Sequence, residues 1–280
     1  MSLTSRVLGR VNVACYRTKD IKRSKHTLVL VRHGESTWNQ EPSRFTGWYD
    51  CPLSEKGHSE AMEAGKLIND SGLTFDIAYT SKLQRAIRTL WHTLESTGLM
   101  YIPIVNKWEL NERHYGALQG LDKQQTVDKF GIEQVTIWRR SYDIPPPPCD
   151  DASPHAPSND PKYCDNAVAA SIRTESLATT LDRVLPLWND EIAPLIKAGQ
   201  KVIISAHGNS LRALVKHLDG IPDSAISKLN IPTGAPLIYT LDQNLKPIKH
   251  ADAIAPLSGH YLGDQDEIKA RILGVANQTK

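Results

Sequence analysis

Two apolar segments of this sequence are each followed directly by the dipeptide His-Gly. Residues 28–32 lead into His33, and residues 201–206 lead into His207. Their length and their aliphatic, partly β-branched side chains predict short buried strands. Because open α/β sheets place their chemistry at the carboxyl ends of strands, we expect the two imidazoles to meet at neighbouring strand ends. One could act as a nucleophile while the other stabilises charge on the transferred group.

The residues around the first histidine favour an anionic ligand. Gly34 allows a sharp turn and a close approach of the backbone to a ligand. Ser36 is expected to cap a following helical turn, whose free N–H groups would attract an anion. Arg32 carries a planar, permanently charged guanidinium that suits phosphate.

A third position that suggests phosphate is Arg85. The sequence predicts a helix that Ser81 caps and that runs to about residue 98. Its apolar residues recur at helical spacing and should face the sheet, namely Leu83, Ile87, Leu90, Trp91 and Leu94. Arg85 then lies in the first turn, where its charge opposes the helix dipole. A bound phosphate would explain that position. The alternative is a solvated surface arginine.

Short strands alternate with helices along most of the chain. This order predicts an α/β fold, a three-layer sandwich with a mainly parallel sheet and helices on both faces. Further strands are expected at 76–80, 102–105 and 237–241. Further helices are expected at 54–72 and 208–220. Another helix should begin at a cap formed by Thr174 and should be kinked at Pro186. The insertion between Glu112 and His207 should form a helical cap over the strand ends. It holds helices at 122–130 and 133–142 and a proline-rich segment, 144–171, where regular structure is not expected.

The motifs together resemble those of a known family. The string from Arg32 to Asn39, Arg-His-Gly-Glu-Ser-Thr-Trp-Asn, with the later His207, resembles the histidine phosphatase superfamily. With residues 44–50 (Arg-Phe-Thr-Gly-Trp-Tyr-Asp) and 111–116 (Asn-Glu-Arg-His-Tyr-Gly), it resembles the cofactor-dependent phosphoglycerate mutases. The resemblance runs from about residue 27 to the C-terminus.

The resemblance implies a mechanism and a cofactor. His33 would be phosphorylated in the resting enzyme, and Arg32, Arg85 and His207 would stabilise the transferred group. Glu112 would move the proton of the leaving and incoming hydroxyls. The enzyme would interconvert 3- and 2-phosphoglycerate in glycolysis, with 2,3-bisphosphoglycerate as primer and intermediate. No metal is required, and the sequence contains no HExxH cluster.

Further positions are expected to bind the substrate. Asn39 and Asn209 can donate neutral hydrogen bonds, and Gly208 can offer its backbone N–H. The resemblance adds positions that hold the substrate in the family, namely Ser36, Thr46, Gly47, Arg113, His114, Tyr115, Lys123, Arg139 and Arg140.

Two alternative functions remain open at this point. A bisphosphoglycerate synthase or a phosphatase would share the five catalytic residues. Lys123, Arg139 and Arg140 favour the mutase, because the substrate carboxylate is a second anion that must be held. A binding or scaffold protein without activity is the third hypothesis, but neither His33 nor Glu112 is lost.

Composition restricts the partners. A net charge of only +2 argues against a general nucleic-acid binder, and no apolar run approaches the roughly 18 residues of a membrane span. The four cysteines lack CxxC spacing, which favours reduced thiols in a cytoplasmic protein, with a Cys149–Cys164 bridge as the alternative. The expected partners are small-molecule phosphoglycerates, and the resemblance suggests a homodimer or homotetramer.

The sequence divides into three parts. Residues 1–26 form a basic extension, either disordered or an organelle transit segment. Residues 27–258 form the catalytic domain. Residues 259–280 form a tail with a helix at 264–275, whose apolar stripe of Ile268, Ile272 and Val275 is narrow, so we expect weak docking and a role as a lid. A frayed terminus is the alternative.

Overall fold

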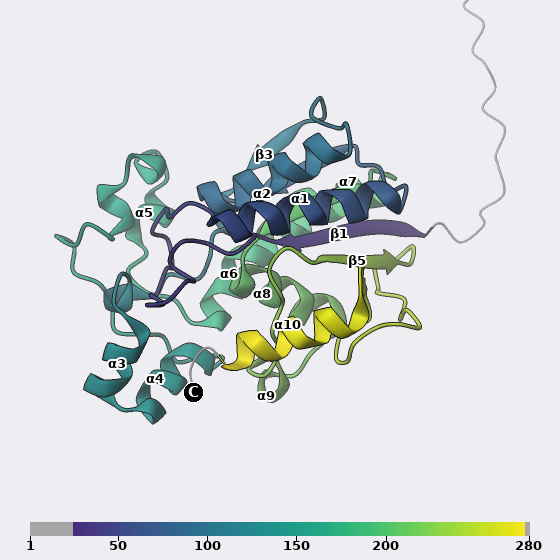
Figure 1. Cartoon of the computed structure of the whole chain (residues 1–280). Coiled ribbons are helices and arrows are strands. Elements are labelled where there is room, and N and C mark those ends of the chain that lie inside the picture. The colour runs from purple at the N-terminus through teal and green to yellow at the C-terminus, as the bar shows by residue number, and fades with distance from the viewer. Residues whose placement is uncertain (1–24, 278–280) are drawn as a thin grey trace, which may run out of the picture.

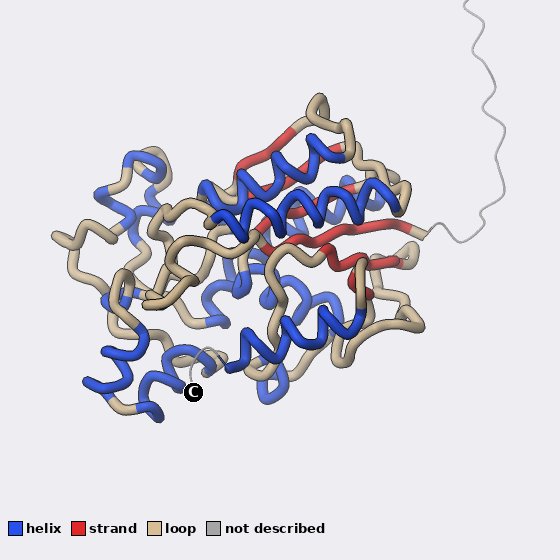
Figure 2. Tube along the Cα trace, viewed as in Figure 1, coloured by secondary structure: helices blue, strands red, loops and turns tan. Residues whose placement is uncertain are grey.

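A six-stranded sheet forms the centre of the molecule. The computed structural model describes residues 25–277, so the predictions for residues 1–24 lie outside it. The sheet order is β3 (Ile104–Asn106), β2 (Ile77–Thr80), β4 (Val202–Ala206), β1 (His26–Arg32), β5 (Pro236–Leu241) and β6 (His260–Tyr261). The first four strands are parallel, β5 pairs antiparallel with β1, and β6 pairs antiparallel with β5. This confirms the predicted α/β sandwich (Figures 1 and 2).

Alternate residues of the central strands supply two cores. Leu28 and Leu30 point toward α6 (Leu177–Leu187) and α8 (Gly208–Asp219), whereas Val29 and Val31 pack under α1 (Glu55–Asp70) and α2 (Gln84–Ser96). All four side chains are buried. Burial on both faces fixes the register of β1, because a slip of one residue would exchange the two sets.

The helices of the first face largely follow their sequence signals. Ser54 caps α1 by accepting a hydrogen bond from the N–H of Gly57. The prediction that Ser81 caps α2 was wrong, because the helix begins after Leu83 and no side chain caps it. The Ser81 hydroxyl contacts the His207 ring instead. Trp91 was expected to face the sheet, but it is 42% exposed.

The second face is built from a long interrupted helix and α8. Ser176, not the predicted Thr174, caps α6 through a reciprocal pair with Thr179. The helix continues past Pro186 as a π-helical turn, Trp188–Ile192, and then as α7 (Ala193–Lys197). Both α6 and α7 pack against the sheet. The insertion between Glu112 and His207 was predicted to form the cap as a whole. This prediction was wrong for α6 and α7, which belong to the layer beside the sheet.

The cap comprises residues 115–175, at the left in Figure 1. It contains α3 (Lys123–Phe130), which Asp122 caps as predicted, and α4 (Ile132–Arg140). The segment 144–171 is more ordered than predicted. It carries α5 (Ala167–Ser171) and short 3₁₀ turns at Pro157–Asn159 and Pro161–Tyr163. Two further 3₁₀ turns, Trp108–Leu110 and Gly116–Leu118, flank the segment that carries Glu112.

The tail adds a strand that the sequence did not predict. The short β6 pairs with β5, and α10 (Gln265–Asn277) follows it across the side of the molecule that also carries α9 (Asp223–Ile226) (Figure 1). Ile268 is buried against the core and Ile272 is half-buried. Within residues 25–277 no helix has the length and apolar character needed to cross a bilayer. Cys149 and Cys164 are both free, so the alternative of a bridge between them was wrong.

Candidate active site

The two predicted histidines meet at the ends of β1 and β4. Their ring centroids lie 4.9 Å apart, and both side chains are buried. The backbone N–H of His33 donates to the carbonyl of Ala206, which brings the two strand ends together. The Nδ1–H of His33 donates to the Gly34 carbonyl at 2.6 Å, an arrangement that leaves Nε2 with its lone pair.

The surroundings keep both imidazoles neutral. Burial, followed by the charges of Arg85 and Arg32, lowers the pKa of His33 well below 6.5. Burial, followed by Arg85 and His33, lowers the pKa of His207 in the same way. A neutral imidazole is the form that can attack phosphorus, so His33 is available as a nucleophile at neutral pH.

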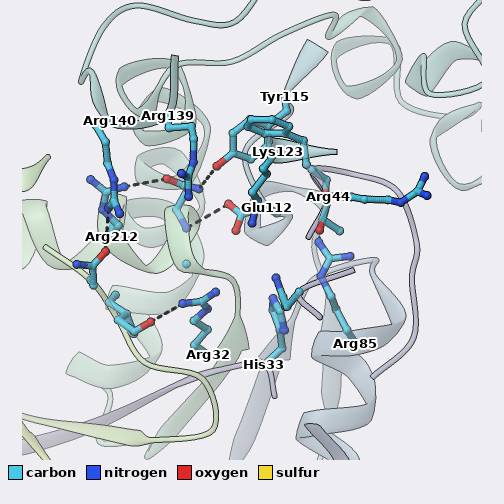
Figure 3. Close-up of a pocket in the computed structure, with 18 residues that line it drawn as sticks. Arg32, His33, Arg44, Arg85, Glu112, Tyr115, Lys123, Arg139, Arg140 and Arg212 are labelled. Atoms are coloured by element: carbon cyan, nitrogen blue, oxygen red, sulfur yellow. Dashed lines mark hydrogen bonds between the residues drawn. The ribbon is translucent and has the colours of Figure 1, made fainter. Parts of the chain in front are cut away.

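Two arginines flank His33 (Figure 3). Arg85 is 1% exposed and donates to the carbonyls of Gly47 and Tyr49 at 2.8 and 2.9 Å, so the surface-arginine alternative was wrong. Arg32 donates to the carbonyl of Ile231 at 2.6 Å. Backbone carbonyls thus fix both guanidinium groups beside the nucleophile before any ligand arrives.

The carboxylate of Glu112 is held by backbone donors. Its Oε1 accepts hydrogen bonds from the N–H groups of Arg113 (2.7 Å) and Asn209 (3.1 Å). Arg183, which the sequence analysis did not identify, supports this segment through the carbonyls of Asn111 and Glu112, both at 3.0 Å. Arg183 also forms a buried ion pair with Glu175 at 2.6 Å.

We expect Arg183→Met to destabilise the fold by about 3–5 kcal/mol, because it leaves the buried Glu175 carboxylate without its partner. The free energy of unfolding from urea titration measures this loss. The exposed Arg88→Met is the control and should change stability by less than about 0.5 kcal/mol. An equal effect of both variants would contradict the assigned role.

The cavity above His33 is strongly cationic. It measures about 110 Å³ and is lined by seven cations and one carboxylate. The predicted residues that line it are Arg32, His33, Asn39, Thr46, Gly47, Arg85, Glu112, Tyr115, Lys123, Arg139, Arg140, Gly208 and Asn209. Lys123, Arg139 and Arg140 reach it from the cap, opposite His33 (Figure 3).

Four predicted residues lie behind the cavity wall. His207 packs against His33, and Arg113 lies over the Tyr115 ring at 4.5 Å. His114 accepts from the N–H of Gly116 at Nδ1, and its Nε2 donates to the carbonyl of His155. The prediction that Ser36 caps a helix was wrong, because a turn follows it and not a helix. Its hydroxyl donates to Asn39 Oδ1 at 2.8 Å and orients that side chain.

Comparison with known proteins identifies the family. The model of the histidine phosphatase superfamily (branch 1) matches residues 28–251. This chain belongs to that superfamily. Membership implies phosphoryl transfer through a phosphohistidine.

Solved structures share the histidine phosphatase fold. A mycobacterial glucosyl-3-phosphoglycerate phosphatase is 23% identical with a TM-score of 0.58, over 78% of this chain and 91% of that one. A putative α-ribazole-5′-P phosphatase from Escherichia coli is 20% identical with a TM-score of 0.60, over 86% and 97%. YhfR of Bacillus stearothermophilus is 25% identical with a TM-score of 0.57, over 79% and 93%.

The site also contains residues that the sequence analysis missed, namely Arg44, Phe45, Arg212, Asn230 and Ile231. Arg212 donates to Asn209 Oδ1 at 3.0 Å and to the Ile226 carbonyl at 2.6 Å. Arg212 lies off the apolar stripe of α8 that Leu211, Leu214, Val215 and Leu218 form, so no local sequence signal marked it. Arg44 instead turns its guanidinium toward the Gly120 carbonyl.

The cations of the cavity repel one another. Burial and the neighbouring charges lower the pKa of Lys123 to about 7, that of Arg139 to about 10 and that of Arg212 to about 9. An anion with more than one negative charge would remove this repulsion. Among residues 25–277 no three His, Cys, Asp or Glu side chains lie together as a metal site.

Proposed function

We propose that this chain interconverts 3-phosphoglycerate and 2-phosphoglycerate through phospho-His33, with 2,3-bisphosphoglycerate as primer and intermediate. The observation that carries the proposal is the presence of two separate cation groups in one small cavity. Arg32 and Arg85 flank His33, and Lys123, Arg139 and Arg140 lie opposite on the cap. The first group suits a phosphate in transfer, and the second suits the other anion of the same substrate.

The chemistry needs two transfers. His33 Nε2 attacks the phosphorus of 2,3-bisphosphoglycerate, the P–O bond breaks, and Glu112 gives its proton to the departing oxygen. Glu112 then removes the proton of the accepting hydroxyl, whose oxygen takes the phosphoryl group back from His33. Arg32 and Arg85 balance charge on the equatorial oxygens during both steps, and the neutral His207, packed against His33, supports the transferred group.

A phosphatase is the second candidate, because two of the three solved structures described above carry the name of a phosphatase. It would follow if water replaced the second hydroxyl as the acceptor. Two features support the mutase over hydrolysis of a larger phosphate ester. The cavity is small, about 110 Å³, which favours a compact substrate over a larger ester, and its cap cations suit a carboxylate held away from the transferred phosphate.

A coupled assay tests the proposal. We expect conversion of 3- to 2-phosphoglycerate that is strongly stimulated by 2,3-bisphosphoglycerate and unaffected by chelators. Release of inorganic phosphate, measured in parallel, should be slower by a factor of at least about 10². Phosphate release from a phosphate ester without any mutase turnover would favour the phosphatase and overturn the proposal.

Substrate binding should be accompanied by proton uptake. At pH 7.5 Lys123, with its pKa lowered to about 7, is mostly neutral, and an anion beside it would raise that pKa again. Uptake of a proton, up to about one per 3-phosphoglycerate, is therefore expected. Calorimetry in buffers of different ionisation enthalpy measures it, and Lys123→Met should lose this component. Equal uptake in both proteins would contradict it.

The proposed lid can be tested by removing α10 alone. Glu267, Arg271 and Gly274 of α10 line an opening that also reaches Arg32 and Asn39 of the site. Truncation after Gly263 keeps β6 paired with β5, unlike a cut at residue 258. We expect slower mutase turnover, intact phosphorylation of His33 and a higher ratio of hydrolysis to transfer. Full activity without added hydrolysis would assign α10 no role as a lid.

A further inference from the structure

Two adjacent residues, Asn230 and Ile231, hold one arginine from each cation group of the active site. Asn230 Oδ1 accepts a hydrogen bond from Nη1 of Arg140, on the cap, at 2.8 Å. The carbonyl of Ile231 accepts from Nη1 of Arg32, beside His33, at 2.6 Å. Both hydrogen bonds are drawn in Figure 3. The relative position of the two guanidinium groups is therefore set by a single dipeptide.

This dipeptide is anchored in the core of the sheet domain. Leu229 and Ile231, on either side of Asn230, are both buried in the main apolar cluster. Asn230 is buried as well, and it lines the cavity. Its amide nitrogen donates to the carbonyl of Lys228 at 3.4 Å, which leaves Oδ1 to face Arg140. The position of the Arg140 side chain thus depends on the sheet domain as well as on the cap.

Asn230 holds Arg140 without cancelling its charge. Their contact is the one hydrogen bond that the Arg140 side chain makes within residues 25–277. An aspartate in place of Asn230 would form a charged, bidentate pair with Arg140 and would compete with an anionic ligand. The neutral amide orients the guanidinium group and leaves its positive charge available to a ligand.

We propose that Asn230 determines specificity for phosphorylated acids, because it orients Arg140 toward the carboxylate of the substrate at a spacing from Arg32 that residues 230–231 set. This inference rests on the proposed function, in which the cap cations hold that carboxylate. Asn230 acts through Arg140 and is a positioning residue. It takes no part in the transfer of the phosphoryl group or of the proton.

Two small phosphates form a matched pair of probes. 3-Phosphoglycerate and glycerol 3-phosphate share the phosphate and the three-carbon chain, but only the first carries a carboxylate. We expect Asn230→Ala to reduce the preference for 3-phosphoglycerate over glycerol 3-phosphate by about tenfold, through loss of an oriented charged hydrogen bond. The affinity for glycerol 3-phosphate should stay within about twofold. Asn244→Ala, at an exposed position, is the matched control and should keep the full preference.

Calorimetric titration of the full-length protein, without 2,3-bisphosphoglycerate, measures both affinities. A double-mutant cycle separates the positioning of Arg140 from a general effect on the fold. In the Arg140→Met protein, Asn230→Ala should change the affinity for 3-phosphoglycerate by less than about twofold, because the group that Asn230 positions is gone. Thermal unfolding reports that each variant is folded.

Asn230→Asp provides a second test with a side chain of the same size. It keeps an acceptor for Arg140 but neutralises it, so the preference for 3-phosphoglycerate should fall here too. A retained preference in both variants, an equal loss of affinity for the two probes in Asn230→Ala, or a full effect of Asn230→Ala in the Arg140→Met protein would each overturn the inference. Binding requires no transfer, so absence of mutase turnover together with the expected changes in affinity would overturn only the proposed function.

Discussion

Replacing His33 with alanine should abolish phosphoenzyme formation and lower turnover by a factor on the order of 10⁵ or more, as for loss of a covalent nucleophile. His33 is the imidazole that lines the cavity, and its Nε2 is free while Nδ1 is bound to Gly34. His207→Ala should leave slow phosphoenzyme formation. Its ring lies behind His33 and hydrogen-bonds with Ser81, so it supports the transferred group and does not receive it.

Labelling with ³²P from 2,3-bisphosphoglycerate measures this directly, since phosphohistidine is labile in acid and stable in base. The exposed His217→Ala is the matched control and should label fully. Stable label on His207 in the His33→Ala protein would reverse the assignment.

Glu112→Gln should lower turnover by about 10²–10⁴ while leaving the Michaelis constant for 3-phosphoglycerate within a few fold. The amide oxygen can still accept from the N–H groups of Arg113 and Asn209, so the side chain keeps its place. It can no longer exchange a proton with the substrate hydroxyl. Steady-state kinetics separate the two constants.

Glu133→Gln, at an exposed position of the cap, is the control for this loss of charge. Unchanged turnover with weaker binding in Glu112→Gln would make the Glu112 carboxylate a structural group and not the proton carrier.

Signals confined to a few neighbouring residues predicted most of the fold. Ser54 and Asp122 cap the helices that follow them, and Gly220 ends α8 in the left-handed conformation. The alternation of buried strands with amphipathic helices was sufficient to predict the layers of the sandwich and the parallel strands at its centre. The two His-Gly turns were sufficient to bring His33 and His207 together, because parallel strands end at the same edge of the sheet.

The errors come from contacts between residues far apart in sequence. Ser81 has the composition of a helix cap, but its hydroxyl is engaged by His207 from another strand. The two-residue strand β6 is too short to show a period and exists only through pairing with β5. Arg183 lies on a helix of ordinary pattern, and only the folded chain shows that it binds the carbonyl groups beside Glu112.

The stems of the cap are joined by a reciprocal pair of hydrogen bonds between His114 and Glu175. The N–H of His114 donates to Glu175 Oε2, and the N–H of Glu175 donates to the carbonyl of His114. The 60 or so residues between them thus begin and end at this pair of hydrogen bonds, where Arg183 also binds the Glu175 carboxylate. Such an insertion behaves as an exchangeable module. Grafting a different cap between these stems would replace Lys123, Arg139 and Arg140 and so redirect the choice of substrate. The graft must also supply the hydrogen bonds that residues 119–123 make to residues 43–48, because the Gly47 carbonyl in that segment holds Arg85.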